Sequence, residues 1–231
     1  MRIDLKETVE LLKQNDNFLL LCHVSPDGDT VGSAVALARA LISCGKKVNI
    51  KCGDEFTKDF QFMFENLELS ESSADFTVAV DVADPKLLGE KFEGLYGDKI
   101  NLCIDHHPSN VMYAEKSYIE PDSASAAEII YELLGIMNVD ITPEIANCLF
   151  VGVSTDTGCF RYSNTTVRTF EIAAELAQAG ADTYNIITAF FETKTKTYAA
   201  LERLALDSMR FYFEDRCALI CITADMYEKS G

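Results

Sequence analysis

Short apolar runs and longer stretches with helical spacing alternate along this chain. The runs FLLLCHV (residues 18–24) and FTVAVDV (residues 76–82) are continuous, as in strands that are buried on both faces of a parallel sheet. Further strands are predicted over residues 47–52 and 100–104, and helices over residues 4–14, 30–43, 125–134, 142–153, 166–179 and 196–211. Because strands alternate with helices, the predicted fold is α/β, a mostly parallel sheet flanked by helices.

Start and stop signals support several of these helix boundaries. The signals are the capping-box pairs Asp4–Glu7 and Ser125–Glu128, the cap and proline Thr142–Pro143, and Gly45 after the second helix. In sheets of this kind, ligands bind beyond the carboxyl ends of the strands. Polar side chains that follow a strand are therefore the first candidates for function.

Composition narrows the class of protein. The 231 residues include 14 Phe and 9 Tyr, which is enough apolar material for a core, so disorder is not expected. No run approaches the ~20 apolar residues that span a bilayer, and the charged first ten residues do not resemble a signal peptide. The eight cysteines form no C-x-x-C pair, which favours free thiols. We therefore expect a reduced, cytoplasmic protein with no membrane partner.

The charge of the chain disfavours one class of partner. With 37 acidic and 20 basic residues, the net charge is −17, which repels the backbone of a long nucleic acid. Any phosphate ligand of this domain must therefore be held locally, by metal ions or by a few cationic groups.

All three histidines of the chain lie at or just past the end of a predicted strand, with aspartates close by. The residues concerned are His23 with Asp27 and Asp29 in the pattern H-x-x-x-D-x-D, and the run Asp105-His106-His107. A single histidine is more often structural than catalytic, and Asp-Gly-Asp alone is more often a turn. Three histidines at strand ends are harder to explain in that way.

Two further aspartates end apolar runs. Asp81 ends a strand, where a buried carboxylate is costly without a partner, and Asp156 follows the apolar residues 147–153. Each could be a helix cap or a turn residue. Taken together with the histidines, they favour a cluster of ligands at one edge of the sheet.

Carboxylates and imidazoles in this mixture suit Mn²⁺ best, with Mg²⁺, Co²⁺ or Zn²⁺ as alternatives. Their number is enough for two divalent metal ions that share one bridging carboxylate. Paired metals ~3.5–4 Å apart are a common arrangement in enzymes that hydrolyse phosphate esters. The residues therefore favour a two-metal hydrolytic site.

Four segments resemble the motifs of the DHH phosphoesterases and occur in the order of that family. They are H-V-S-P-D-G-D-T-V-G-S (residues 23–33), the strand that ends at Asp81, I-D-H-H-P (residues 104–108) and S-T-D-T-G-C-F-R-Y-S-N-T-T (residues 154–166). Within the family, the chain is most similar to the bacterial nanoRNases that also dephosphorylate 3′-phosphoadenosine 5′-phosphate. The resemblance covers about residues 15–180 and implies a Rossmann-like catalytic domain.

The resemblance also implies a role for each of these side chains. The implied metal ligands are His23 and Asp27 for the first ion, Asp29, His106 and Asp156 for the second, and Asp81 as the bridge. His107 would contact the substrate phosphate, and Asp105 would accept a hydrogen bond from a histidine and fix its tautomer. Arg161 either adds positive charge near a phosphate oxygen or is an ordinary surface residue.

The chain departs from the family in its last part. The family's second domain carries a glycine-rich G-G-G-H motif, but no histidine follows His107 here. Residues 217–223 form a strand-like run, and a single strand cannot bury both of its faces. We therefore expect a catalytic domain over residues 1–190, a linker helix over 191–212, and the start of a truncated, DHHA1-like second domain over 213–231.

The leading hypothesis is a two-metal phosphoesterase that cleaves short oligoribonucleotides to mononucleotides and 3′-phosphoadenosine 5′-phosphate to AMP. Alternatives in the superfamily are a linear or cyclic dinucleotide phosphodiesterase, a manganese pyrophosphatase and a single-strand exonuclease of RecJ type. A non-catalytic nucleotide- or metal-binding module is a different class, and the complete ligand set argues against it. The sequence leaves a homodimer open.

Overall fold

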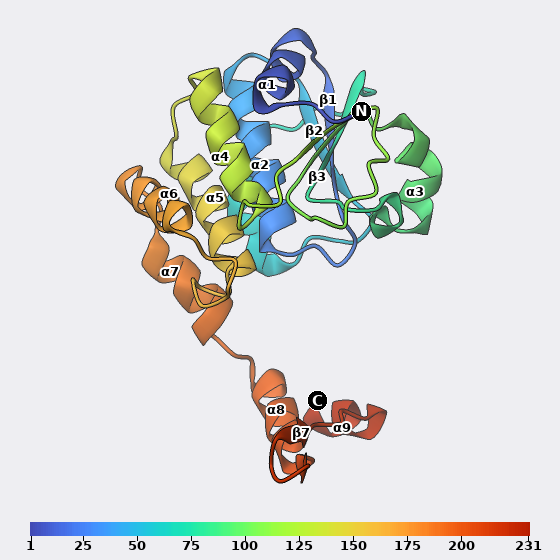
Figure 1. Cartoon of the computed structure of the whole chain (residues 1–231), viewed down its shortest axis with the longest axis vertical. Helices are drawn as coiled ribbons and strands as arrows, with labels where there is room; N and C mark the ends of the chain where they lie inside the picture. Colours follow the sequence, from blue (N-terminus) through green and yellow to red (C-terminus); the bar gives the residue numbers. More distant parts are fainter. The chain divides into compact units, whose positions relative to one another are not determined.

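The computed structural model describes residues 1–231, which divide into two compact units, Met1–Phe190 and Phe191–Gly231. The first unit is built on a five-stranded sheet of order β2-β1-β3-β4-β5, in which all neighbouring strands are parallel (Figure 1). The strands are β1 (Phe18–Cys22), β2 (Val48–Cys52), β3 (Phe76–Val80), β4 (Leu102–Asp105) and β5 (Lys116–Ile119). The predicted α/β fold with a parallel sheet is confirmed.

The central strands form because they are apolar on both faces. All residues of β1 and of β3 are buried. The four predicted strands are all present, with ends close to those expected from the apolar runs. The sequence pattern does not predict β5, because this edge strand is short and alternates between half-buried and buried residues.

Helices cover both faces of the sheet. On one face lie α1 (Leu5–Gln14), α2 (Gly28–Ser43), α4 (Ala126–Met137) and α5 (Pro143–Asp156), and on the other lies α3 (Glu90–Tyr96) (Figure 1). Buried side chains of α2, α4 and α5 form one continuous core with the central strands. This core fixes the helix ends that carry polar residues to the edge of the sheet.

Glycines allow α2 and α5 to pack closely. A Cβ atom added at Gly32 would lie 2.3 Å from the carbonyl oxygen of Cys148, and one added at Gly152 would lie 2.8 Å from a carboxylate oxygen of Asp29. Neither position can therefore carry a larger side chain without a shift of its neighbour. The close approach brings Asp156, the last residue of α5, near the first turn of α2.

Most of the predicted helix signals are confirmed. Those confirmed are the capping box of Asp4 and Glu7, the Thr142 cap with Pro143 in the first turn, and Gly45 with a φ of 80° after α2. The box predicted at Ser125 is only half formed. Ser125 accepts from the backbone N–H of Glu128, but the Glu128 carboxylate accepts from the N–H of Ala124 instead of that of the cap.

Some boundaries differ from those predicted. α2 begins at Gly28 rather than near residue 30, because the Asp27 side chain accepts from the N–H groups of Asp29 and Thr30. α5 continues to Asp156 rather than ending near residue 153. The helix predicted over residues 196–211 ends at Asp207, because residues 210–212 form a strand.

Shorter elements complete the first unit. They are η1 (Lys58–Phe64), η2 (Pro85–Leu88), η3 (Gly97–Lys99), α6 (Val167–Gln178), α7 (Thr183–Ile187) and the π-helical turn η4 (Thr188–Glu192), which runs past residue 190. The helix predicted over residues 166–179 is confirmed as α6, with Thr166 as its cap. None of the helices combines the length and apolar composition needed to span a lipid bilayer.

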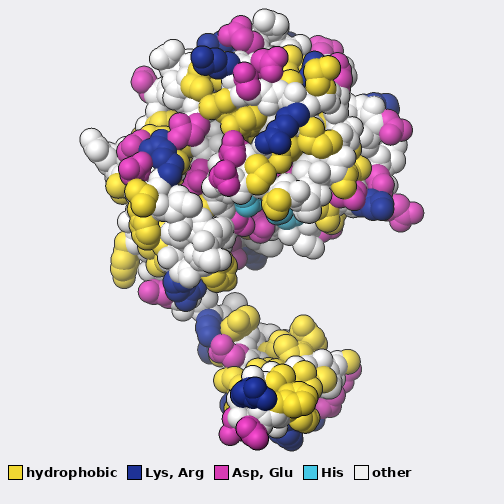
Figure 2. All heavy atoms as spheres, in the orientation of Figure 1, with side chains coloured by type: hydrophobic (Ala, Val, Ile, Leu, Met, Phe, Trp, Pro, Cys, Tyr) yellow, Lys and Arg dark blue, Asp and Glu magenta, His cyan; other side chains and the backbone are white.

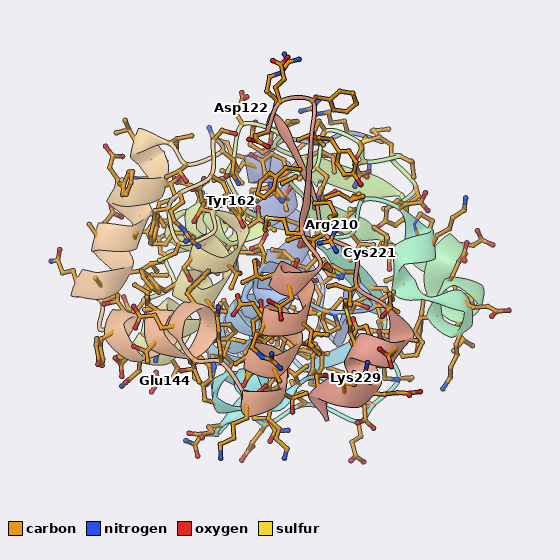
Figure 3. All side chains as sticks on the ribbon, turned by 90° about the horizontal axis from the view of Figure 1, so that it is seen from below. Asp122, Glu144, Tyr162, Arg210, Cys221 and Lys229 are labelled. Atoms are coloured by element: carbon orange, nitrogen blue, oxygen red, sulfur yellow. The ribbon has the colours of Figure 1, made fainter.

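The second unit contains a helix, a hairpin and a short final helix. Its elements are α8 (Lys196–Asp207), β6 (Arg210–Tyr212), β7 (Cys217–Leu219) and α9 (Ala224–Ser230). The strand predicted over residues 217–223 appears as β7, which pairs antiparallel with β6 and not with the main sheet. The Ser208 hydroxyl bonds to the backbone of Cys221, and Figure 3 shows Arg210 and Cys221 at the base of this hairpin.

Candidate metal centre

Side chains that can bind a cation meet at the carboxyl edge of the sheet. His23 follows β1, Asp81 follows β3, and His106 and His107 follow β4, and these three strands are neighbours in the sheet. Because parallel strands end at the same edge, residues far apart in sequence come together there. Figure 2 shows histidine side chains at the surface of the first unit, next to acidic ones.

Helix ends carry three more aspartates to this edge. Asp27 is the N-cap of α2, Asp29 lies in the first turn of the same helix, and Asp156 is the last residue of α5. Asp29 is fully buried, whereas Asp27 and Asp156 are partly exposed. The edge therefore combines buried and accessible carboxylates.

Three groups of these side chains bring ligand atoms within 4.8 Å of one another. The groups are His23–Asp27–Asp81, Asp29–His106–Asp156 and Asp81–His106–His107. The first group holds the residues expected for one metal, and the second holds those expected for the other. Their roles as ligands stay predictions.

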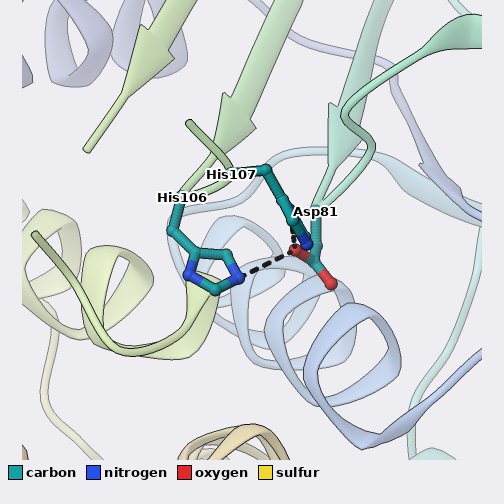
Figure 4. Close-up of side chains that lie close together, drawn as sticks. All are labelled: Asp81, His106 and His107. Carbon is teal, nitrogen blue, oxygen red and sulfur yellow. Dashed lines mark ion pairs between the residues drawn. The ribbon is translucent and has the colours of Figure 1, made fainter. Parts of the chain in front are cut away.

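Asp81 lies between the two histidines that belong to different groups. Its Oδ2 atom is 3.8 Å from Nε2 of His23. Its Oδ1 atom is 3.6 Å from Nε2 of His106, and Figure 4 shows this second contact. Asp81 Oδ1 and His106 Nε2 are both buried and have no hydrogen-bond partner. Buried polar atoms in proteins almost always have a partner, and a cation between these two would supply it. The residues present therefore fit divalent cations.

The electrostatics of the centre favour a cation as well. Burial and the charges of Asp156 and Asp27 raise the pKa of Asp29 to about 8. The pKa of Asp81 is raised well above its usual range by burial and by Asp29, and burial also raises the pKa of Asp156. No lysine or arginine forms an ion pair with these carboxylates, whose ion-pair partners are histidines. The carboxylates therefore lack a compensating positive side chain.

His107 is the most exposed histidine of the centre, with 43% of its side chain accessible. Its Nδ1 atom lies 2.8 Å from Oδ1 of the buried Asp105, which also accepts from the Asn110 amide at 2.6 Å. Burial opposes ionisation of Asp105, but the hydrogen bonds from His107 and Asn110 outweigh it and lower the pKa of Asp105. The bond to Asp105 raises the pKa of His107. The contact occupies Nδ1 and leaves Nε2 as the free ring nitrogen.

Arg161 is the one predicted site residue that the structure does not join to the centre. It is exposed, and its Nε donates to the carbonyl of Gly158 at 2.6 Å. No hydrogen bond or ion pair links it to the histidines and aspartates described above.

Three residues outside the predicted set hold the predicted ones in place. Asn110 donates to Asp105, the Ser123 carbonyl lies 3.2 Å from Nδ1 of His106, and the Asn164 amide donates to the carbonyl of Asp156 at 3.2 Å. A backbone carbonyl carries no sequence signal. Asn164, by contrast, lies within the run over residues 154–166 and could have been considered.

Residues 17–153 match the profile described as DHH family, N-terminal domain. The chain is 30% identical over 215 residues to the "Bifunctional oligoribonuclease and PAP phosphatase NrnA" of Thermus thermophilus. The matched region covers 90% of this chain and 63% of that protein. A protein of the same name from Mycoplasma genitalium is 32% identical over 183 residues, covering 76% of this chain and 57% of its own length. The chain thus spans about three fifths of the length of these relatives.

Solved structures show the same architecture. An exopolyphosphatase-related protein from Bacteroides fragilis superposes with a TM-score of 0.87 at 25% identity, covering 98% of this chain and 71% of that protein. A putative family II inorganic pyrophosphatase from Methanococcus jannaschii superposes with a TM-score of 0.58 at 21% identity, and the match covers 92% of this chain and 74% of that protein. The second likeness concerns the fold alone.

Proposed function

The chain belongs to the DHH family, and on this premise we propose that it is a metal-dependent phosphoesterase that hydrolyses short oligoribonucleotides to mononucleotides and 3′-phosphoadenosine 5′-phosphate to AMP. The names of the relatives from Thermus thermophilus and Mycoplasma genitalium support this substrate class. The observation that carries the proposal is the position of Asp81, which presents one carboxylate oxygen to His23 and the other to His106.

Two divalent cations fit the His23–Asp27–Asp81 group and the Asp29–His106–Asp156 group, and Asp81 lies between His23 of the first and His106 of the second. His23 and Asp27 would hold one, and Asp29, His106 and Asp156 would hold the other. Mn²⁺ suits this mixture of carboxylate and imidazole ligands best. When bound, such cations stabilise negative charge on a phosphate and lower the pKa of a nearby water.

Side chains beside these groups orient the substrate. Asp105 holds Nδ1 of His107, so the free Nε2 of this exposed ring can contact a phosphate oxygen. Because Asp105 raises the pKa of His107, the ring carries a proton to donate over a wider pH range. The bond from Arg161 to Gly158 uses only Nε, so the remaining guanidinium nitrogens would be the ones to contact a phosphate oxygen that extends beyond the centre.

The charge of the chain agrees with a small substrate. A net charge of −17 disfavours the long-range capture of extended RNA or DNA. A short oligonucleotide or a nucleotide bisphosphate carries few charges, and the centre itself can hold them. Recognition would then depend on local contacts at the phosphate.

The proposal is tested by substrate comparison in the presence of Mn²⁺. The substrates are bis(p-nitrophenyl) phosphate, a dinucleotide, a pentanucleotide, 3′-phosphoadenosine 5′-phosphate, a cyclic dinucleotide and pyrophosphate. We expect release of nitrophenol from the activated ester and loss of all activity when the metal is chelated. Short RNA and 3′-phosphoadenosine 5′-phosphate should be hydrolysed faster than the cyclic dinucleotide and pyrophosphate. A protein that binds two Mn²⁺ ions and hydrolyses only pyrophosphate, or no substrate of the series, contradicts the proposal.

A further inference from the structure

Residues 123–127, at the start of α4, contact the residues of the second group, Asp29, His106 and Asp156. This segment lies directly before and within the first turn of α4. Its backbone reaches His106 and Asp29 directly, and it reaches Asp156 through one further side chain, that of Asn164. Of the three residues of the group, His106 follows β4, Asp29 lies in α2 and Asp156 ends α5, so one segment connects side chains that three different elements position.

The contact to His106 fixes the ring nitrogen that faces the group. The carbonyl of Ser123 lies 3.2 Å from Nδ1. A carbonyl can only accept, so this bond places a proton on Nδ1, and in the neutral ring Nε2 is then the nitrogen that can bind a cation. Nε2 is the atom that lies 3.6 Å from Asp156 and 4.0 Å from Asp29.

The contact to Asp29 uses the free N–H groups of a helix start. The N–H groups of Ala126 and Ala127 donate to the two carboxylate oxygens of Asp29 at 2.6 and 2.9 Å. The first N–H groups of a helix have no partner within the helix and favour negative charge. The start of α4 therefore orients this buried carboxylate.

The contact to Asp156 passes through the Asn164 amide. Nδ2 of Asn164 donates to the carbonyl of Ala124 at 2.9 Å and to that of Asp156 at 3.2 Å. Both partners are acceptors, so the network requires the NH₂ group at this position. On the other side of Ala124, its N–H donates to the Glu128 carboxylate at 3.0 Å. Ala124 is thus held from both sides, and the end of α5 is joined to it by one amide.

We infer that Asn164 is a positioning residue for the second cation, because its amide joins the backbone at Asp156 to the segment that orients His106 and Asp29. This inference rests on the metal-dependent function proposed above. Neither Asn164 nor residues 123–127 bond to the first group, in which Thr30 joins Asp27 to the backbone before Asp81. His23 bonds through Nδ1 to the carbonyl of Val24, and Asp27 accepts from N–H groups at the start of its own helix. Loss of the Asn164 amide should therefore affect one cation and not the other.

The test is Asn164→Asp, which keeps the size of the side chain but replaces its two donors with an acceptor. Mn²⁺ binding is measured by isothermal titration calorimetry, and the environment of the ions by electron paramagnetic resonance, which distinguishes an isolated Mn²⁺ from an exchange-coupled pair. We expect the first ion to bind as in the wild type and the second to bind ~10–100-fold more weakly, the usual effect of losing a residue that supports a ligand. Asn164→Ala, which adds no charge, should show the same pattern.

Asn101→Asp is the matched control. It adds the same charge near the start of β4, and the Asn101 side-chain oxygen that accepts from the Thr77 N–H is retained. We expect it to bind both ions normally. Binding of two ions with wild-type affinities by both Asn164 variants overturns the inference, and so does loss of both ions together or loss of the fold in both. A wild-type chain that binds two ions but hydrolyses no phosphoester contradicts the proposed function and leaves this inference standing.

Discussion

Replacing Asp81 with asparagine isolates the charge of this residue from its size. Asp81 is 3% exposed, and its backbone has a φ of 59°, a left-handed conformation that Asn and Asp both tolerate. The change therefore removes one buried charge and leaves the backbone and the packing nearly as they are. It should have opposite effects on the metal-free and the metal-loaded protein.

In the metal-free protein, we expect Asp81→Asn to be stabilising. Oxygens of Asp81 and Asp29 both lie within 4.0 Å of Nε2 of His106. The two carboxylates are therefore less than about 8 Å apart, and at an effective dielectric constant of ~20 two negative charges at this distance repel by about 2 kcal/mol. For a protein of this size, 2 kcal/mol corresponds to roughly 4–8 °C in melting temperature.

This gain should depend on pH. Folding raises the pKa of Asp81 well above its usual range and that of Asp29 to about 8, whereas a free aspartate titrates near ~3.9. Raised pKa values mean that the folded state holds protons which the unfolded state has released. The stability they contribute is complete below pH ~4 and is lost as the pH rises through the folded values. The advantage of Asp81→Asn should thus be small near pH 5 and larger at pH 9.

Thermal unfolding in EDTA at both pH values measures the effect, with Asp98→Asn as the control. Asp98 is exposed, so its substitution should change stability by less than ~0.5 kcal/mol. With Mn²⁺ at 100 times the dissociation constant, the wild type should gain about 2.7 kcal/mol for each bound ion, while Asp81→Asn gains little and hydrolyses no substrate. A variant less stable than wild type in EDTA at pH 9, or one with two bound ions and near-normal turnover, would refute this reasoning.

Three further predictions concern other parts of the structure. His107→Ala should keep its metal content while turnover of bis(p-nitrophenyl) phosphate falls ~10²–10³-fold, and loss of an ion from this variant would make His107 a ligand instead. Asp105→Asn should lower the pKa of His107, because Asp105 raises it in the wild type, and an unchanged titration midpoint by NMR in the metal-free protein would contradict this. Gly32→Ala should lower the free energy of unfolding by ~1–3 kcal/mol in urea, because the added Cβ meets the Cys148 carbonyl at 2.3 Å; no loss would show that α2 and α5 separate easily.

Much of the fold could be predicted because the central strands are buried on both faces. Continuous apolar runs identify β1 and β3 with little ambiguity, since all their residues lie in the core. The edge strand β5 has half-buried residues and no such run. The sequence also places the end of α8 too late. The pattern of residues 196–211 is compatible with a continuous helix, but residues 210–212 pair with β7 instead.

The residues of the centre could be predicted where one physical rule places them. Side chains that follow parallel strands must meet at one edge, and this rule places His23, Asp81 and His106 together without knowledge of the strand order. The residues that support them are set by contacts across long separations, such as Asn164 with Ala124, forty positions apart. No periodicity or local spacing records such a contact, so only the folded structure shows it.

The charge of the centre gives a reason for two cations rather than one. When ionised, Asp27, Asp29, Asp81 and Asp156 carry four negative charges, and no lysine or arginine is paired with them. The charge of Asp105 is met separately, by His107. One divalent cation would leave a net charge of about −2, which repels an anionic phosphate by several kcal/mol at contact distance. Two divalent cations balance the four carboxylates. If the proposed function and the inferred role of the segment before α4 are correct, occupancy of the second group should therefore govern the binding of an anionic substrate as well as its hydrolysis.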